Sequence, residues 1–147
     1  MGAPHPVWTM PVLLRSTMFP AKLEALHGLR HFLESFCAQA AIGRDGCLRL
    51  NLVLEELFTN TVRHGHRGDS EAPVWVSLAR SQDGRVALSY EDTAPPFNPY
   101  GRVSPDTTQE IGKLGGRGVL LLQRLSATRD YAYLYGRNCV RLALNVD

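Results

Sequence analysis

Two neighbouring stretches with a helical spacing of apolar residues constrain the fold of this chain more than any other feature. The first lies within residues 21–41 and the second within 45–64. The repeating residues are Leu23, Leu26, Leu29, Phe32, Leu33 and Phe36 in the first stretch, and Leu50, Val53, Leu54, Leu57 and Phe58 in the second. Gly43 is expected to end the first helix in the left-handed conformation, Asp45 to cap the second helix, and Gly65 to end it. Each helix therefore presents an apolar stripe that has to pack on another layer.

Five strand-like runs supply that second layer. They span residues 12–18, 74–79, 85–90, 128–134 and 140–146. Asp83-Gly84 predicts a hairpin between the second and third runs, because this pair readily takes positive φ angles. Residues 135–138 join the last two runs, and a further helix is expected over residues 118–125. The expected fold class is an α+β two-layer sandwich, in which a mixed, mostly antiparallel sheet is covered on one face by about three helices.

The composition fits one cytoplasmic domain over residues 1–147, with 1–11 as an N-terminal lead. No run approaches the roughly 18 apolar residues of a membrane span, and the chain does not open with a secretory leader. The net charge of +2 comes without a basic stripe, which argues against a direct nucleic-acid partner. The cysteines, Cys37, Cys47 and Cys139, lack both metal-ligand spacing and an even count, so they are expected to be free thiols.

The first candidate site segment is the end of the second expected helix, residues 55–65. Glu56, Asn60 and His64 follow one another at intervals of four, so they share one helix face. An amide oxygen is a suitable ligand for Mg²⁺, and a carboxylate one turn away can accept a proton from a nucleophile. Taken alone, the same three residues also fit an ordinary solvated helix face.

Two further segments carry groups suited to a nucleotide. Asp92 follows a strand and opens a proline-rich turn, where its carboxylate could accept a hydrogen bond from an exocyclic amino group such as that of adenine. Residues 112–122 form a glycine-rich loop that opens an apolar helix, and backbone N–H groups in such a loop can cradle phosphate. Lys113 and Arg117 add positive charge there, but the loop lacks the GK[ST] ending of a Walker A motif. Each segment alone also fits a structural turn.

The order of the three segments is more specific than any one of them. Glu-x-x-x-Asn on a helix, Asp after a hairpin strand, a long loop and then Gly-Gly-x-Gly opening a helix resemble the N, G1 and G2 boxes of the GHKL (HATPase) superfamily. This superfamily comprises the ATP-binding domains of gyrase, heat-shock chaperones, mismatch-repair proteins and histidine kinases. Within it, the chain most resembles the stand-alone anti-sigma-factor serine/threonine kinases of the RsbW type. The segments that carry the resemblance are residues 55–65, 96–99 and 115–121.

The resemblance implies a role for each segment. Glu56 would act as general base on a protein hydroxyl or a water, Asn60 would hold Mg²⁺, and Asp92 would read adenine. Gly116 and Gly118 would carry the phosphates of ATP, with residues 98–114 as the nucleotide lid. The other residues expected at the nucleotide are Ala94, Phe97, Lys113, Gly115 and Arg117. The implied partners are a small STAS-type antagonist protein, phosphorylated on Ser or Thr, and a sigma factor, exchanged in a partner switch that regulates transcription. A homodimer is implied as well.

One residue departs from the family pattern. The family shows Asp-x-Gly after the strand, whereas this chain has Asp92-Thr93-Ala94. If that glycine needs a positive φ angle, or lets the base approach closely, Ala94 adds strain or bulk. Two alternatives to the kinase therefore stay open. One is a non-catalytic domain that binds a sigma factor or another regulator, with nucleotide as a structural ligand or absent. The other is slow ATP hydrolysis without a protein acceptor.

Overall fold

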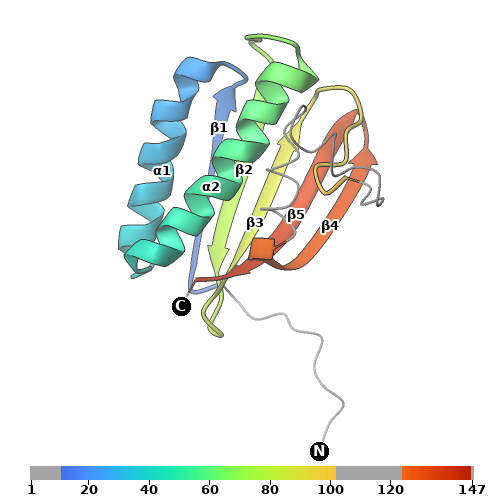
Figure 1. Cartoon of the computed structure of the whole chain (residues 1–147). Helices are drawn as coiled ribbons and strands as arrows, with labels where there is room; N and C mark the ends of the chain where they lie inside the picture. The colour runs from blue at the N-terminus through green and yellow to red at the C-terminus, as the bar shows by residue number, and fades with distance from the viewer. Residues whose placement is uncertain (1–10, 102–123, 147) are drawn as a thin grey trace, which may run out of the picture.

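The computed structural model describes residues 11–101 and 124–146. It shows two helices lying on one face of a five-stranded sheet (Figure 1). In chain order the elements are β1 (Leu13–Pro20), the 3₁₀ turn η1 (Leu23–Ala25), α1 (Leu26–Gln39), α2 (Arg44–Asn60), the π-helical turn η2 (Thr61–Gly65), β2 (Pro73–Arg80), β3 (Arg85–Asp92), β4 (Ser126–Leu134) and β5 (Arg137–Asn145). None of the helices in these residues is long and apolar enough to cross a membrane.

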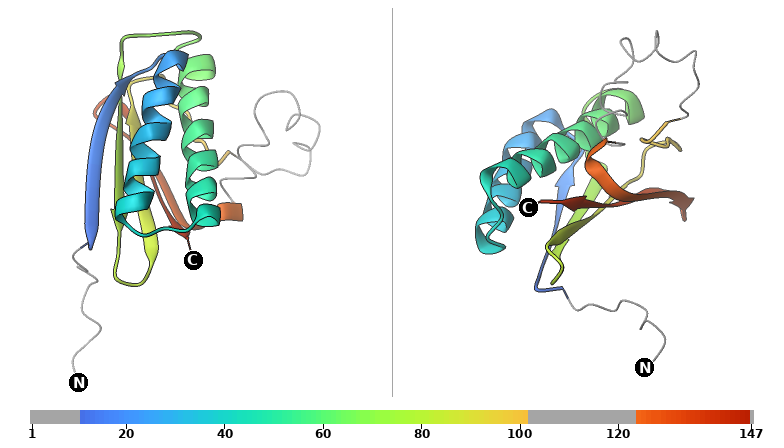
Figure 2. Two further views of the ribbon diagram at one scale, coloured as in Figure 1. Left: turned by 90° about the vertical axis from the view of Figure 1, so that its left-hand side faces the viewer. Right: turned by 60° about the horizontal axis from the view of Figure 1, so that its bottom comes forward.

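The sheet has the strand order β1-β2-β3-β5-β4, and all four pairings are antiparallel. Both helices pack on the same face, and no described element covers the other face (Figure 2). The expected α+β sandwich with a mostly antiparallel sheet is therefore confirmed. Of the third expected helix, residues 118–125, all but the last two lie outside the described residues.

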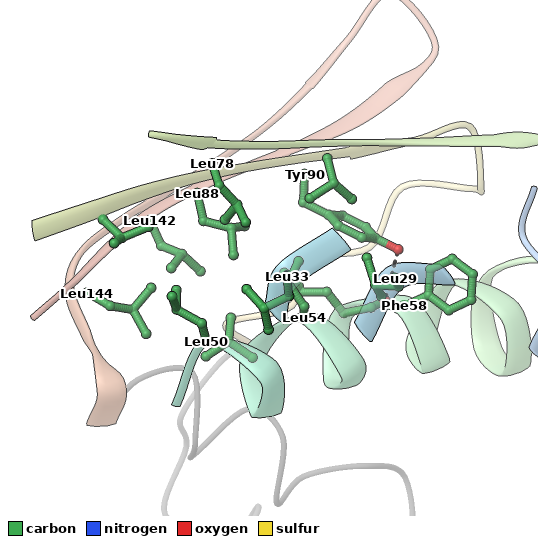
Figure 3. Close-up of a cluster of buried hydrophobic side chains, with 14 of the residues drawn as sticks. Leu29, Leu33, Leu50, Leu54, Phe58, Leu78, Leu88, Tyr90, Leu142 and Leu144 are labelled. Atoms are coloured by element: carbon green, nitrogen blue, oxygen red, sulfur yellow. Dashed lines mark hydrogen bonds between the residues drawn. The ribbon is translucent and has the colours of Figure 1, made fainter. Parts of the chain in front are cut away.

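The core lies between the two helices and the sheet. Alternate residues of the central strands point into it, which gives β3 and β5 their regular alternation of buried and exposed positions. Figure 3 shows leucines of both layers meeting there, with the ring of Tyr90 lying between the sheet and the helices. The main buried side chains are Leu29, Leu33, Phe36, Leu50, Leu54, Phe58, Leu78, Leu88, Tyr90 and Leu144. The apolar stripes expected from the spacing are thus the faces that the helices bury.

Two expectations about helix ends were wrong. Gly43 has an ordinary φ of −69°, and it is Gly43, not Asp45, that stands at the N-cap of α2. The left-handed residue after α1 is Ala41, with φ 55°. This conformation turns the chain so that the N–H of Ile42 bonds the Cys37 carbonyl at 2.9 Å and closes the helix end. Burial of the Ile42 side chain in the core favours ending the helix here rather than one or two residues later.

Candidate functional site

The C-terminal ends of α2 and β3 lie together at one end of the molecule. Both elements run in the same direction, toward the top of Figure 1. Glu56 and Asn60 are on the last turns of α2, and Asp92 is the final residue of β3. Asn60 and Asp92 line the same small cavity. The structure therefore brings together a helix segment and a strand end that are far apart in the sequence.

Glu56 and Asn60 form the pair that their spacing predicts. The Asn60 amide is close enough to the Glu56 carboxylate to lower its pKa. Partial burial nevertheless raises the pKa of Glu56 above its ordinary value, and the nearby Asn60, His64 and Arg63 oppose that rise. A carboxylate whose pKa is shifted toward neutrality is better matched to a role as general base than an exposed one.

His64 does not continue this pair along an α-helix. The α-helix ends at Asn60, and residues Thr61–Gly65 form a π-helical turn in which the N–H of His66 bonds the carbonyl of Thr61 at 2.9 Å. The π-helix turns less per residue, so the interval of four no longer places His64 directly above Asn60. Its side chain is exposed, at the edge of the site.

Asp92 is a buried carboxylate with hydrogen-bond donors on both oxygens. Its Oδ2 accepts from Thr61 Oγ1 at 2.7 Å, and its Oδ1 accepts from Asn138 Nδ2 at 2.8 Å and from the Ala94 N–H at 3.1 Å. An ionised carboxylate has about four acceptor positions, so one remains for a ligand. Because these donors fix the orientation of the carboxylate, Asp92 is preorganised to receive a further N–H donor.

A chain of hydroxyl groups stands behind Thr61. The Thr61 hydroxyl has one proton, and an ionised Asp92 can only accept, so Thr61 donates to Asp92. The Tyr90 hydroxyl, 2.6 Å from Thr61 Oγ1, is then the donor to Thr61. Complete burial raises the pKa of Tyr90 well above its usual range, so this phenol keeps its proton. The sequence reading did not identify Thr61 or Tyr90 as part of the site.

Asn138 was not predicted as part of the site either. It was expected in the turn between the last two strands, but it lies in β5, opposite Asp92, and is buried. Besides Asp92, its Nδ2 donates to the carbonyls of Ala94 at 3.0 Å and Pro95 at 3.1 Å. The signal was present in the sequence. Asn138 occupies the inward position in the alternation that continues with Val140 and Leu142, where a polar residue needs an internal partner.

The other end of the Asn138 amide holds the loop after β3. Its Oδ1 accepts from the Phe97 N–H at 2.9 Å and from the Tyr131 hydroxyl of β4. Carbonyls and a carboxylate surround one end of the amide, and donors surround the other, which sets its orientation. Further along the loop, the Tyr100 hydroxyl bonds the Arg141 carbonyl at 2.8 Å. The loop is therefore attached to the β4–β5 hairpin at two points.

Ala94 adds bulk at the site but no backbone strain. Its φ angle is not among the positive values found for non-glycine residues in the described chain. Its methyl group is buried against Gly65, where an added Cβ would lie 2.7 Å from the Ala94 Cβ. The cavity between these residues and Asp92 measures about 30 Å³, which is room for one or two water molecules. Pockets that enclose whole ligands are roughly ten times larger.

Of the remaining predicted site residues, one lies at the cavity and the others lie outside the described part of the chain. Phe97 lines the cavity and is 47% exposed, as expected for a residue at the mouth of a ligand site. The predicted phosphate-binding residues Lys113, Gly115, Gly116, Arg117 and Gly118 lie outside the described residues, as does the lid beyond Gly101.

The described residues fit a magnesium ion held mainly by its nucleotide. They contain no group of three His, Cys, Asp or Glu side chains that could hold a metal ion by themselves. Mg²⁺ in nucleotide sites keeps several waters and substrate phosphates and takes only one or two protein ligands. The amide oxygen of Asn60 is suited to be such a ligand. Bound there, the ion would supply charge neutralisation for the phosphates.

The sequence and the fold of the chain can both be compared with those of known proteins. The histidine kinase-like ATPase domain family matches residues 19–144. Among solved structures, the RsbU and RsbW domains of Rv1364c from Mycobacterium tuberculosis superpose with a TM-score of 0.65 at 18% identity, covering 92% of this chain and 32% of that one. The chain thus spans about a third of that protein.

A second solved structure, the histidine kinase AdeS from Acinetobacter baumannii, gives a TM-score of 0.47 at 17% identity, covering 92% of this chain and 70% of that one. No curated protein matches the sequence. Because the family matches most of the chain, the protein belongs to the histidine kinase-like ATPase domain family.

Proposed function

We propose that this domain binds Mg·ATP and transfers the γ-phosphate to a serine or threonine of a small anti-sigma-factor antagonist, as a kinase in a partner switch with a sigma factor. The observation that carries the proposal is the meeting of Asn60, one helical turn after Glu56 on α2, with the orientated carboxylate of Asp92 in one cavity at one end of the fold. The RsbW domain in the superposed structure supports the choice of partner class.

Each described residue has one task in this reaction. The Asp92 carboxylate accepts a hydrogen bond from the exocyclic amino group of adenine. Thr61 and Asn138 keep this carboxylate in place. Asn60 is the protein ligand for Mg²⁺. Glu56 takes the proton from the attacking hydroxyl as that oxygen bonds the γ-phosphorus, while the bond from the phosphorus to the β–γ bridging oxygen breaks and ADP leaves; the raised pKa of Glu56 favours this role. The reaction then depends mainly on positioning and charge stabilisation, which is typical of phosphoryl transfer.

The proposal is tested by mixing the protein with γ-labelled Mg·ATP and with small STAS-type proteins that bind it. Label on a serine or threonine of the bound partner is the expected result. Nucleotide binding without any transfer to a bound partner would contradict the kinase.

A second candidate function is a non-catalytic domain that sequesters a sigma factor or another regulator. The specific observation in its favour is the cavity of about 30 Å³, which the Ala94 methyl group narrows against Gly65. A purine could enter only if the Ala94–Phe97 loop moved. In this function the nucleotide is a structural ligand or is absent.

Replacing Ala94 by glycine is expected to raise the affinity for ATP about fivefold or more. The Ala94 methyl group would crowd the bound base, and overpacking of this kind costs about 1 kcal/mol or more. Equilibrium binding of a fluorescent ATP analogue would measure the change. Ala87→Gly, at an exposed position of β3, the strand that precedes the Ala94 loop, is the matched control and should leave the affinity unaltered. Equal affinity of wild type and Ala94→Gly would show that the methyl group does not obstruct the base.

A further inference from the structure

Two of the free cysteines face each other where the first two helices are joined. Cys37 is in the last turn of α1, Cys47 is in the first turn of α2, and residues 40–43 connect the helices. The helices run antiparallel, so these two turns lie side by side at the bottom of Figure 1. The nucleotide site is at the other end of α2, so the chemistry of this cysteine pair does not depend on the proposed function.

The two side chains are neighbours within one cluster of packed residues. Cys37 is buried in the core between α1, α2 and the sheet, and Cys47 packs against that core from its rim. Burial, together with the Cys47 thiol, raises the pKa of Cys37 above its ordinary value. An effect of one thiol on the other requires the two groups to lie close together. Closeness is the first condition for a disulfide, since cysteines with Cα atoms more than about 7 Å apart cannot be bridged without backbone movement.

The two thiols differ in how easily a reagent can reach them. Cys47 is partly exposed and lines a surface hollow of about 350 Å³ between α1 and α2. The other lining residues are Leu33, Glu34, Arg44, Leu48 and Asn51. Cys37 is not one of them, and it is only 4% exposed. A small solute in the hollow therefore meets Cys47 first, with Cys37 behind it.

We propose that Cys37 and Cys47 form a modification site, which hydrogen peroxide oxidises to an intramolecular disulfide. Cys47 reacts first, as the thiolate: its sulfur bonds one peroxide oxygen while the O–O bond breaks, which makes Cys47 a sulfenic acid. The released hydroxide takes up the proton that the Cys47 thiol lost. The Cys37 sulfur then bonds the Cys47 sulfur as the S–O bond breaks, and the departing hydroxide leaves as water with the Cys37 proton. In all, the two thiols lose two electrons, and the peroxide is reduced to two molecules of water.

Burial assigns the second step to Cys37. A buried thiol with a raised pKa keeps its proton and is a poor first nucleophile. Once Cys47 carries the sulfenic acid, however, Cys37 is the thiol beside it. Condensation with a neighbouring thiol is the reaction that competes with further, irreversible oxidation to sulfinic acid. Cys37 would thus protect Cys47, and the disulfide would fasten the end of α1 to the start of α2.

Cys139 provides a comparison within the same chain. It is in β5, between the buried positions Asn138 and Val140, so its side chain points to the sheet face away from the helices. Its thiol donates to a carboxylate oxygen of Glu91 at 3.4 Å. Burial and the Glu91 carboxylate raise the pKa of Cys139. On that face neither of the other two cysteines can reach it, so we expect no disulfide within the chain at Cys139.

Peptide mapping of the full chain after treatment with millimolar hydrogen peroxide tests the proposal. Trypsin cuts after Arg44, so Cys37 and Cys47 fall in the separate peptides 31–44 and 45–49. Mass spectrometry without reduction should find these two peptides linked and Cys139 unlinked, and dithiothreitol should separate them. Cys139→Ser is the matched control and should form the same link. Cys47 that stays reduced, Cys47 sulfinic acid beside an unreacted Cys37, or links between different chains alone would each overturn the proposal.

Thermal melting and two variants test the order of the steps. The oxidised wild type should melt about 5–10 °C above the reduced protein, because the disulfide closes a short loop. Cys37→Ala should leave Cys47 as a sulfenic acid that dimedone traps, whereas the wild type should give little adduct there. In Cys47→Ala the peroxide should neither label Cys37 nor raise the Tm. A dimedone adduct on Cys37 in that variant would contradict the assigned order.

Discussion

Asn138→Asp is expected to lower the stability of the domain by about 3 kcal/mol at neutral pH and to abolish nucleotide binding. The change puts a second buried carboxylate against Asp92 Oδ1 and against the Ala94 and Pro95 carbonyls, where Asn138 Nδ2 now donates. Removing a donor from a buried charge and adding a like charge is among the costliest single changes in a protein. For a domain of this size the loss corresponds to a fall of about 10 °C in Tm.

The pH dependence of this variant distinguishes charge repulsion from a packing defect. Two carboxyl groups so close share a proton, so the pKa of one rises in the folded state. The folded form then binds more protons than the unfolded form, and the lost stability should return in part on acidification. Asn145→Asp, an exposed position of the same strand, is the matched control and should melt like the wild type. A stable Asn138→Asp variant that still binds ATP would show that Asn138 does not position Asp92.

Glu56→Gln is expected to lower the rate of phosphotransfer by about 10²–10⁴, the usual contribution of a general base. Glutamine has nearly the same shape and can still accept a hydrogen bond from Asn60, so Mg·ATP affinity should change little. Labelled transfer to a bound partner protein measures the rate, and calorimetry measures the affinity. Glu55→Gln is the matched control, because Glu55 immediately precedes Glu56 in α2 but pairs with Arg30 of α1.

The pH profile of the wild type bears on the same residue. Burial raises the pKa of Glu56 above the ordinary value of 4.5. A base must be unprotonated, so the rate should fall on acidification through that raised pKa, at a higher pH than for an exposed glutamate. The free energy of unfolding changes with pH in the opposite direction to the rate. The folded state binds the Glu56 proton more tightly than the unfolded state, so the stabilising contribution of Glu56 is present below pH 4.5 and is lost as the pH rises through the folded pKa. Glu56→Gln should therefore be slightly more stable than the wild type at neutral pH. Unchanged phosphotransfer in Glu56→Gln would show that another group is the base.

Much of the fold followed from residue patterns because burial has a period. The helical spacing of Leu29, Leu33 and Phe36, and the alternation along β3 and β5, identify faces that have to meet. The ends of the helices were less predictable. Whether Ala41 or Gly43 takes the left-handed conformation depends on where Ile42 can be buried, which is a property of the packed structure.

In the site, too, local contacts were predictable from the sequence and long-range contacts were not. Glu56 and Asn60 were predictable because their contact is local, one helical turn apart. The donors to Asp92 were not, because Thr61 and Asn138 reach it across 31 and 46 residues of chain. Only the strand register decides that Asn138 faces Asp92. The consequence of Ala94 also required the structure: its backbone is unstrained, and its methyl group occupies the space beside Gly65.

The most direct test of the central claim is calorimetric titration of the protein with Mg·ATP, comparing the wild type with Asp92→Ala. We expect saturable binding to the wild type and its loss in folded Asp92→Ala, because the carboxylate that accepts a hydrogen bond from the adenine amino group is gone. Asp130→Ala, an exposed aspartate of β4, should bind like the wild type. Absence of binding to the folded wild type at millimolar Mg·ATP would contradict a nucleotide site at Asp92 and favour a domain that acts by binding a protein partner alone.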